Sequence, residues 1–299
     1  MRSRIAFLLV VVAALVLVVL PGSAGAVTNG QFDGNNHPYV AYLDNGVFAC
    51  SGTLLSPTVI VTAAHCFSDS TSALGTNSVT GAPIVRVSFD PNLINDNNVQ
   101  RNWFYGSYYF DPQFQIGAGG GLPGFDTHDV AVVILTAAGC AVPPPAGRTG
   151  SCGPVPSSAT LGKYGALPAP NKVDTLGMGT AVDLVGYGVQ NFVNGGGPCG
   201  GPCKKQGGDA FTRFYAQTTL VASNNSISDE FIKLHSNQAG TCFGDSGGPN
   251  LLGGTNIVLA VNSFVANLIC SGNTYSYRID TPQALGWIRT TVAARGGSL

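Results

Sequence analysis

The chain has 299 residues, of which 44% are apolar and only 10% are charged, and its formal net charge is −1. A nucleic-acid binder needs a clustered basic surface and a disordered tail needs a high charge density, so this composition argues against both. The 41 glycines and 18 prolines favour many turns between short apolar strands, and the length suits two packed β units.

The first 26 residues have the pattern of a secretory signal peptide. Arg2 and Arg4 precede an uninterrupted apolar run over 5–20, and Ala24-Gly25-Ala26 is a small-x-small cleavage pattern. The run is shorter than the roughly 20 residues that span a bilayer, although an uncleaved membrane anchor stays an alternative. We therefore expect residues 1–26 to be removed and the mature, secreted chain to begin at Val27.

Short runs of β-branched and aromatic residues recur along the rest of the chain, separated by Gly, Pro, Asn and Asp. No βαβ alternation is present, so the pattern favours an antiparallel sandwich or barrel. The strand-like runs are 39–43, 58–62, 83–89, 130–135, 181–185, 211–221 and 258–261.

Three segments have the composition of elaborated loops: 92–121, 141–156 and 194–208. The second carries three consecutive prolines and separates the two halves of the chain. A helix is predicted only at the C-terminal end, where Thr281 can cap, Pro282 takes the first helical position, and a Gly pair follows Ala294 closely.

Eight cysteines behind a signal peptide predict disulfides, and counting alone leaves their pairing open. A zinc site is disfavoured, because the two closest cysteines lack a second nearby pair of Cys or His ligands. The cysteines are Cys50, Cys66, Cys140, Cys152, Cys199, Cys203, Cys242 and Cys270.

The segment 244–249, Gly-Asp-Ser-Gly-Gly-Pro, carries the strongest chemical signal. A serine hydroxyl is a poor nucleophile unless a base removes its proton, and its reaction with a carbonyl needs N–H donors that hold the oxyanion. Glycines around Ser246 allow a sharp turn that exposes the hydroxyl. Gly-rich turns are common in this chain, but six specified positions argue against a chance match.

A base and a carboxylate can be assigned from their surroundings. His65 follows the apolar run 59–62 and precedes Cys66, which would tether the imidazole, whereas the other three histidines lack such a context. Asp129 stands at the start of a fully apolar run, where an unpaired carboxylate is costly. Asp126, in a more polar loop, is the alternative carboxylate.

The three segments, in the order His, Asp, Ser, resemble the chymotrypsin/trypsin-like serine proteases. The resemblance extends over about 27–290 and is sharp only near the motifs. It implies an all-β fold of two antiparallel six-stranded β-barrels with a C-terminal helix. One barrel would occupy 27–150 and the other, with the helix, 151–299, and the site would lie between them.

By the same resemblance, Ser246 is the nucleophile, His65 the general base and Asp129 the carboxylate that orients the base. These roles are carried over from the family. The backbone N–H groups of Gly244 and Ser246 would form the oxyanion hole, and Ser263 would hydrogen-bond Asp129.

The resemblance also pairs Cys50 with Cys66 behind the histidine and Cys242 with Cys270 beside the specificity pocket. The other four cysteines are assigned to local loops as Cys140–Cys152 and Cys199–Cys203, and the last pair departs from the family pattern. Segment 69–90 contains no Glu and so lacks the acidic calcium loop of animal relatives. No calcium, other metal or cofactor is expected.

Val27-Thr28-Asn29-Gly30 resembles the start of mature family members. In the family, the new α-amino group inserts and pairs with the Asp that precedes the nucleophile, here Asp245. We expect signal cleavage itself to create this terminus, without a separate propeptide.

The specificity pocket departs from that of trypsins. Gly240 stands where they carry an Asp, Val265 stands where they carry a wall Gly, and Tyr275 aligns with a second wall Gly. A shallow pocket of this kind predicts a small or medium apolar residue before the scissile bond. Phe243 is placed at the rim or on the apolar surface.

Two other functions stay open. A non-catalytic homologue acting as a binding module usually lacks Ser or His, and this chain keeps both. A serine esterase of the α/β-hydrolase kind shares Gly-x-Ser-x-Gly but needs the order Ser, Asp, His. We expect a monomer that acts on protein or peptide substrates, with no nucleic-acid partner and no membrane contact once the signal is removed.

Overall fold

The computed structural model of the protein describes residues 27, 30–93, 103–115, 127–136, 150–189, 191–194, 204–207, 211–222, 229–236, 240–265, 270 and 272–299. For 191–194, 204–207 and 222 it describes the backbone alone. The predicted signal segment, 1–26, lies outside the described residues. Within the described ranges, no helix has both the length and the apolar character needed to cross a membrane.

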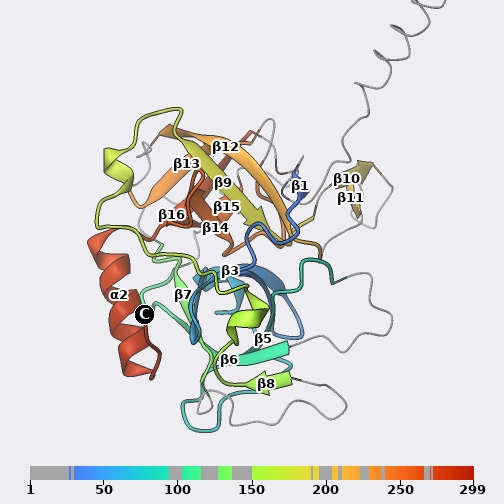
Figure 1. The fold of residues 1–299 in the computed structure, drawn as a ribbon, viewed down its shortest axis with the longest axis vertical. Coiled ribbons are helices and arrows are strands. Elements are labelled where there is room, and N and C mark those ends of the chain that lie inside the picture. Colours follow the sequence, from blue (N-terminus) through green and yellow to red (C-terminus); the bar gives the residue numbers. More distant parts are fainter. Residues whose placement is uncertain are drawn as a thin grey trace, which may run out of the picture.

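Six antiparallel strands close the first barrel, in the order β5-β2-β3-β4-β7-β6, and pairing of β5 with β6 completes the ring. Strand β8 adds to β6 in the parallel direction. This barrel is the lower one in Figure 1. Its strands are β2 (Val40–Asp44), β3 (Ala49–Ser56), β4 (Val59–Thr62), β5 (Ile84–Ser88), β6 (Trp103–Phe110), β7 (Ala131–Ile134) and β8 (Gly150–Cys152).

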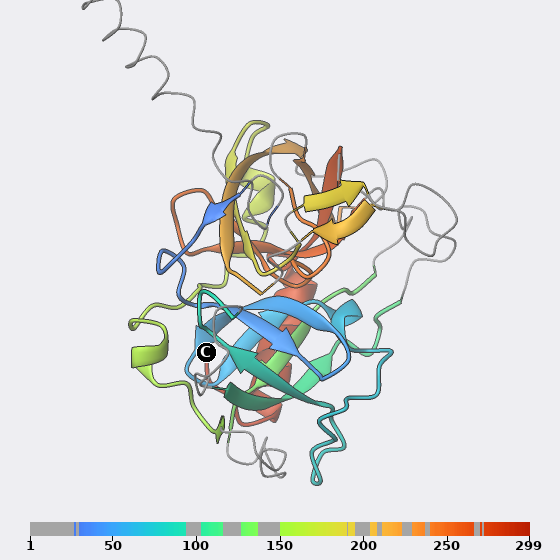
Figure 2. The same cartoon turned by 90° about the vertical axis from the view of Figure 1, so that its right-hand side faces the viewer.

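The second barrel contains six antiparallel strands in the order β12-β13-β16-β15-β14-β9, and β9 pairs again with β12. The short β1 adds to β12, and β10 and β11 form a separate hairpin. Figure 2 shows the two barrels stacked on each other. The strands are β1 (Gln31–Phe32), β9 (Ala181–Gly186), β10 (Asn191–Asn194), β11 (Lys204–Gly207), β12 (Phe214–Ala222), β13 (Phe231–His235), β14 (Pro249–Leu252), β15 (Val258–Val265) and β16 (Asn273–Arg278).

The register of β4 and β7 brings two chain segments of the candidate site together. Both strands are fully buried, and every residue in them except Thr62 is apolar, as expected for strands covered on both faces. They are antiparallel, and Thr62 lies opposite Ala131. The residues that follow Thr62 and those that precede Ala131 therefore leave the sheet at the same end.

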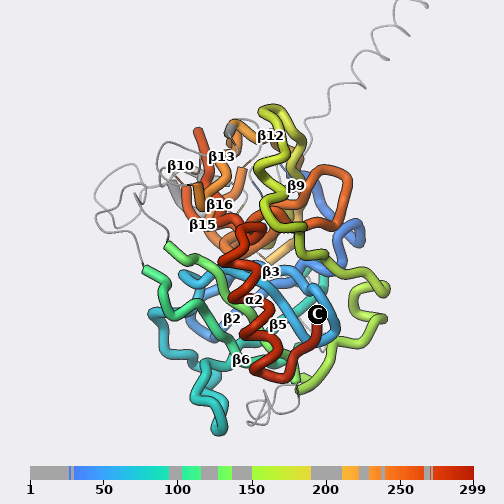
Figure 3. Tube along the Cα trace, turned by 90° about the vertical axis from the view of Figure 1, so that its left-hand side faces the viewer, coloured from blue at the N-terminus to red at the C-terminus, as the bar shows by residue number. Residues whose placement is uncertain are grey.

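Helix α2 (Pro282–Ala294) closes the chain, with Thr281 as its N-cap and Pro282 at its first position. The Thr281 side chain accepts a hydrogen bond from the Ala284 N–H at 3.2 Å. Figure 3 shows the helix running from the second barrel along the first. Gly297, just past the helix, lies against Val59 of β4. Among the described residues there are also three 3₁₀ turns: η1 (Ala64–Cys66), η3 (Ser157–Ala159) and η4 (Val173–Thr175).

The predicted fold class, two six-stranded antiparallel barrels with a C-terminal helix, is confirmed. Two loop predictions were wrong in part. Segment 92–121 contains β6, whose aromatic residues favour a strand and pack into the barrel. Segment 194–208 contains β11, which pairs with β10. Both segments were predicted to be loops because they contain many glycines or asparagines, and these hid the shorter runs of residues that form the strands.

Candidate active site

His65 lies in the η1 turn that directly follows β4. Its ring Nδ1 is 2.8 Å from Asp129 Oδ2, and its backbone N–H donates to Asp129 Oδ1 at 2.9 Å. The Asp129 side chain is 3% exposed, whereas that of His65 is 28% exposed. One carboxylate thus fixes both the ring and the backbone of a histidine that still faces solvent.

Asp129 is held from the second barrel as well. The Ser263 hydroxyl, on β15, donates to Asp129 Oδ2. Burial raises the pKa of the Asp129 carboxyl, but the charge and hydrogen bonds of His65, together with the Ser263 hydrogen bond, lower it below its ordinary value. Burial lowers the pKa of His65, and the charge and hydrogen bond of Asp129 outweigh this and raise it. Asp126, the alternative carboxylate, lies outside the described residues.

Ser246 lies in a turn that packs directly on the chain leading to His65. The Ser246 carbonyl accepts a hydrogen bond from the Ser51 N–H at 2.8 Å, and the Thr62 hydroxyl donates to the Ser51 carbonyl at 2.8 Å. Gly247 has φ +73°, and a Cβ there would lie 2.0 Å from the Thr62 hydroxyl oxygen. Only glycine lets this turn approach so closely.

The hydroxyl of Ser246 and the ring of His65 are both described, and no hydrogen bond joins them. Such contacts are often long before substrate binds and tighten in the complex. The N–H groups of Gly244 and Ser246 likewise donate to no acceptor in the described part of the chain. These are the two donors that the resemblance assigns to an oxyanion hole.

Asp245 is completely buried beneath this turn. Its carboxylate accepts hydrogen bonds from the Gly188 N–H at 2.8 Å and the Cys242 N–H at 2.9 Å, and a third from the Val27 N–H. Burial raises the pKa of Asp245 to about 7, although these three hydrogen bonds act to lower it. Val27 is also fully buried. The predicted partners Val27 and Asp245 are therefore in contact.

Two glycines make room for the buried carboxylate, and the sequence analysis did not identify them. A Cβ on Gly186 would lie 2.2 Å from Asp245 Oδ1, and one on Gly188 would lie 2.5 Å from the carboxyl carbon. The sequence signal is the pattern Gly-Tyr-Gly at the end of a buried strand. Interior glycine weakens a strand and often marks close approach of another group.

Tyr108 is a further residue that the sequence analysis did not identify. This buried side chain donates to the carbonyls of Ala63 and Ala64 at 2.8 and 2.7 Å. It thereby supports the backbone from which His65 projects. Its signal was hidden, because segment 92–121 was interpreted as a loop.

Two of the predicted disulfides are present, Cys50–Cys66 and Cys242–Cys270. The first connects β3 to the η1 turn that carries His65. Cys152 is also disulfide-bonded. Its predicted partner Cys140, and the predicted pair Cys199–Cys203, lie outside the described residues.

The predicted pocket residues have different surroundings in the second barrel. Val265 packs against this bridge. Tyr275 is 6% exposed, and its ring stacks on Phe264 at 5.0 Å between centroids. A Cβ on Gly240 would lie 2.5 Å from the Cβ of Ser236. Phe243 is 44% exposed.

The described ranges contain no group of three or more His, Cys, Asp or Glu side chains that could hold a metal ion. Two of the other histidines lie beside carboxylates elsewhere. His37 Nδ1 lies 2.6 Å from an oxygen of Asp33, and His128 Nδ1 lies 3.8 Å from an oxygen of Asp111.

Comparisons with known proteins place the chain in a family and show the same fold in a solved structure. The family model described as Trypsin matches residues 27–288. The structure resembles a solved structure of HL collagenase with a TM-score of 0.60 and 18% sequence identity, over 89% of this chain and 99% of that one. At this identity the likeness shows the fold alone. No curated protein matches the sequence. The family match covers most of the chain, and we conclude that the protein belongs to the trypsin family of serine proteases.

Proposed function

We propose that the protein is a secreted serine endopeptidase in which Ser246, His65 and Asp129 form the catalytic triad. The observation that carries this proposal is the continuous contact from Ser263 through Asp129 to His65, with the Gly-Asp-Ser-Gly turn packed against the same backbone. A buried carboxylate that orients a partly exposed imidazole is what a general base requires.

The geometry supports the following reaction. The Nδ1–H of His65 donates to Asp129, so Nε2 is left as the acceptor for the Ser246 hydroxyl proton. The hydroxyl oxygen attacks the substrate carbonyl, and the N–H groups of Gly244 and Ser246 bind the resulting oxyanion. His65 then gives the proton to the leaving amine. Water, activated by His65 in the same way, hydrolyses the acyl-enzyme.

Labelling with a fluorophosphonate probe tests the proposal. The mature protein should react at Ser246, and S246A and H65A should not. Ser72 is a buried serine that donates to the Ile84 carbonyl, so S72A is a matched control that should react like the wild type. Absence of reaction in the folded wild-type protein would favour the non-catalytic binding module.

The mature terminus is the second part of the proposal. We propose that removal of residues 1–26 frees the Val27 α-amino group, which then pairs as an ammonium with Asp245. The buried contact between the Val27 N–H and the Asp245 carboxylate supports this. N-terminal sequencing of the secreted protein should give Val-Thr-Asn-Gly, and any other start contradicts the assignment.

The substrate preference is the third part. By the resemblance, Val265 and Tyr275 take the positions of two wall glycines of trypsins and should narrow the pocket, and Gly240 offers no carboxylate for Arg or Lys. We propose cleavage after small or medium apolar residues. A panel of Ala, Val, Leu, Phe and Arg chromogenic substrates should show Ala, Val or Leu preferred, and fast cleavage after Arg would overturn the proposal.

A further inference from the structure

We infer that the Asp33–Arg213 ion pair positions the N-terminal segment, so that the Val27 terminus stays inserted beside Asp245. In this view the pair is a tether, and its two members are positioning residues. The inference rests on the proposed function, because it concerns the terminus that the proposal creates.

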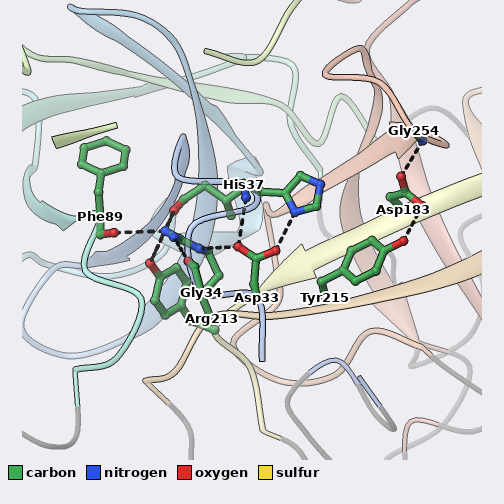
Figure 4. A network of polar contacts seen from close by, with 10 residues as sticks. Asp33, Gly34, His37, Phe89, Asp183, Arg213, Tyr215 and Gly254 are labelled. Carbon is green, nitrogen blue, oxygen red and sulfur yellow. Dashed lines mark hydrogen bonds and ion pairs between the residues drawn. The ribbon is translucent and has the colours of Figure 1, made fainter. Parts of the chain in front are cut away.

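Arg213 is the centre of a buried network that Figure 4 shows. Its side chain and that of Asp33 are both 0% exposed, and Nε donates to Asp33 Oδ2 at 2.9 Å. The other guanidinium donors are bound by groups of both barrels and of the N-terminal segment. These acceptors are the Val40 and Phe89 carbonyls, each at 3.0 Å, the Tyr187 hydroxyl at 3.1 Å and the Gly34 carbonyl at 2.5 Å.

Asp33 is attached to Arg213 at two points. Besides the side-chain pair, the Asp33 N–H donates to the Arg213 carbonyl at 3.0 Å. The Asp33 carboxylate also accepts from the His37 N–H at 3.1 Å and lies 2.6 Å from His37 Nδ1. Every carboxylate oxygen is thus bound, and the backbone at Asp33 is held at the start of β12.

The tether lies only six positions after Val27 in the sequence. Between them, β1 pairs with β12, with Gln31 opposite Tyr215 and Phe32 opposite Phe214. Val27 itself packs into the apolar core of the second barrel, and its carbonyl accepts from the Gly30 N–H at 2.6 Å. The segment is therefore fixed at both of its ends.

A short tether favours insertion by raising the effective concentration of the terminus at its site. For short flexible linkers this concentration is on the order of millimolar. Six residues reach at most about 20 Å when extended, so an anchored Asp33 confines the Val27 ammonium to the neighbourhood of Asp245. Released from Arg213, the same terminus would sample a much larger volume.

The equilibrium between the inserted and the released terminus can be measured from the rate at which cyanate carbamylates the Val27 α-amine. An inserted amine reacts only after transient release, so its rate is proportional to the fraction released. Asp33→Asn replaces the carboxylate with a neutral amide. It therefore weakens the hydrogen bond that Asp33 accepts from the charged guanidinium of Arg213. We expect the mature D33N protein to be carbamylated at Val27 roughly tenfold faster than the wild type or more.

Asp44→Asn is the matched control. Asp44 is buried and pairs with Arg86 at 2.7 Å, on strands of the first barrel that do not carry the terminal segment. It should lose stability in urea much as D33N does, but its Val27 should be carbamylated at the wild-type rate. Equal carbamylation of D33N and D44N, corrected for their measured stabilities, would overturn the inference.

A milder variant covers the case in which D33N does not fold. Phe32 is 56% exposed and its ring meets Phe214 edge-on at 6.2 Å, so Phe32→Ala should loosen β1 without threatening the core. Met178→Ala, at an 82% exposed side chain, is its control. F32A should be carbamylated faster than M178A, and equal rates would count against the tether.

The outcome is separable from that of the proposed function. A wild-type protein whose Ser246 fails to react with a fluorophosphonate refutes the proposed function. A reactive wild type with unchanged carbamylation in D33N and F32A leaves the function intact and refutes only the tether.

Discussion

Ser263, on β15 of the second barrel, donates a hydrogen bond to the same oxygen of Asp129 that the ring of His65 contacts. Asp129 lies two residues before the first residue of β7 in the first barrel, so one carboxylate oxygen connects the two barrels. The orientation of the His65 imidazole therefore depends on the second barrel as well as on the first barrel, which carries His65. Removal of a single hydroxyl can test this dependence.

Ser263→Ala should lower kcat/KM by roughly tenfold, because it removes one hydrogen bond to a buried carboxylate. The fold should be retained, since the change is small and lies at a partly buried position. Steady-state kinetics on the preferred peptide substrate measures the loss, with S72A as control. Unchanged kinetics in S263A would show that His65 and its own turn suffice to orient the carboxylate.

The pH dependence of His65 follows from its contact with Asp129. His65 must be neutral to accept the Ser246 proton, and Asp129 raises its pKa above the ordinary value. Activity should therefore fall with decreasing pH through a value above about 6.5. In Asp129→Asn the raising contact is gone and burial remains, so the His65 pKa should fall below its ordinary value.

Nuclear magnetic resonance of the His65 ring protons measures this shift independently of turnover. The titration is best done in an S246A background, with D129N and D126N compared. D129N should move the His65 pKa downward and, in the active background, reduce kcat by about 10⁴-fold. D126N should change neither. A shift caused by D126N and not by D129N would reassign the third member of the triad.

The residues of the candidate site that could be predicted from the sequence are those that stand in short contiguous motifs. His65 and Ser246 stand in short, specific segments, and Asp129 follows from the cost of burying a carboxylate without a partner. Strand β6 was missed because its flanking Asn and Gly residues masked an aromatic run, and Tyr108 was lost with it. The composition of a segment does not show whether it will pair with strands that are distant in the sequence to close a barrel.

Gly186 and Gly188 illustrate a second limit. Their role depends on a carboxylate more than fifty positions away in the sequence, and only the folded structure brings Asp245 against them. The Asp33–Arg213 pair has the same character, since its members are 180 positions apart. Contacts of this kind arise from barrel closure and leave no local pattern.

Gly188→Ala tests the space that Asp245 requires. A Cβ at this position would lie 2.5 Å from the Asp245 carboxyl carbon, and the carboxylate is held by three backbone N–H groups. Asp245 must then move, and with it the turn that carries Gly244 and Ser246. Disturbing one oxyanion donor lowers kcat by about 10²–10³-fold, and we expect a loss of this size.

Gly177→Ala is the control for this variant, because a Cβ there meets no atom within 4 Å. Both proteins are assayed for kcat and for stability in urea. G188A should lose both, since overpacking in a core costs typically about 1–3 kcal/mol. Wild-type activity in G188A would mean that the turn tolerates a displaced Asp245.

The pKa of Asp245 predicts different stability profiles for the chain before and after its terminus is freed. In the chain that continues N-terminally past Val27, this carboxyl has a pKa of about 7, against 3.8 ordinarily. Between those values the folded state holds a proton that the unfolded state has lost, so rising pH favours unfolding. Over the full interval the difference corresponds to roughly 4 kcal/mol as an upper bound.

A free Val27 ammonium should remove this loss of stability with rising pH. An opposite charge beside the carboxylate lowers its pKa, so the mature chain should not lose this stability between about pH 4 and pH 7. Urea unfolding of two S246A proteins, one starting at Val27 and one with a short soluble extension before it, measures the difference. The two proteins share their titrating side chains and differ only in the α-amino group, which stays protonated below about pH 7, so the difference between the curves from pH 4 to pH 7 reports on Asp245. The gap should widen as pH rises towards neutrality, and parallel curves would mean that the Val27 ammonium does not reach Asp245.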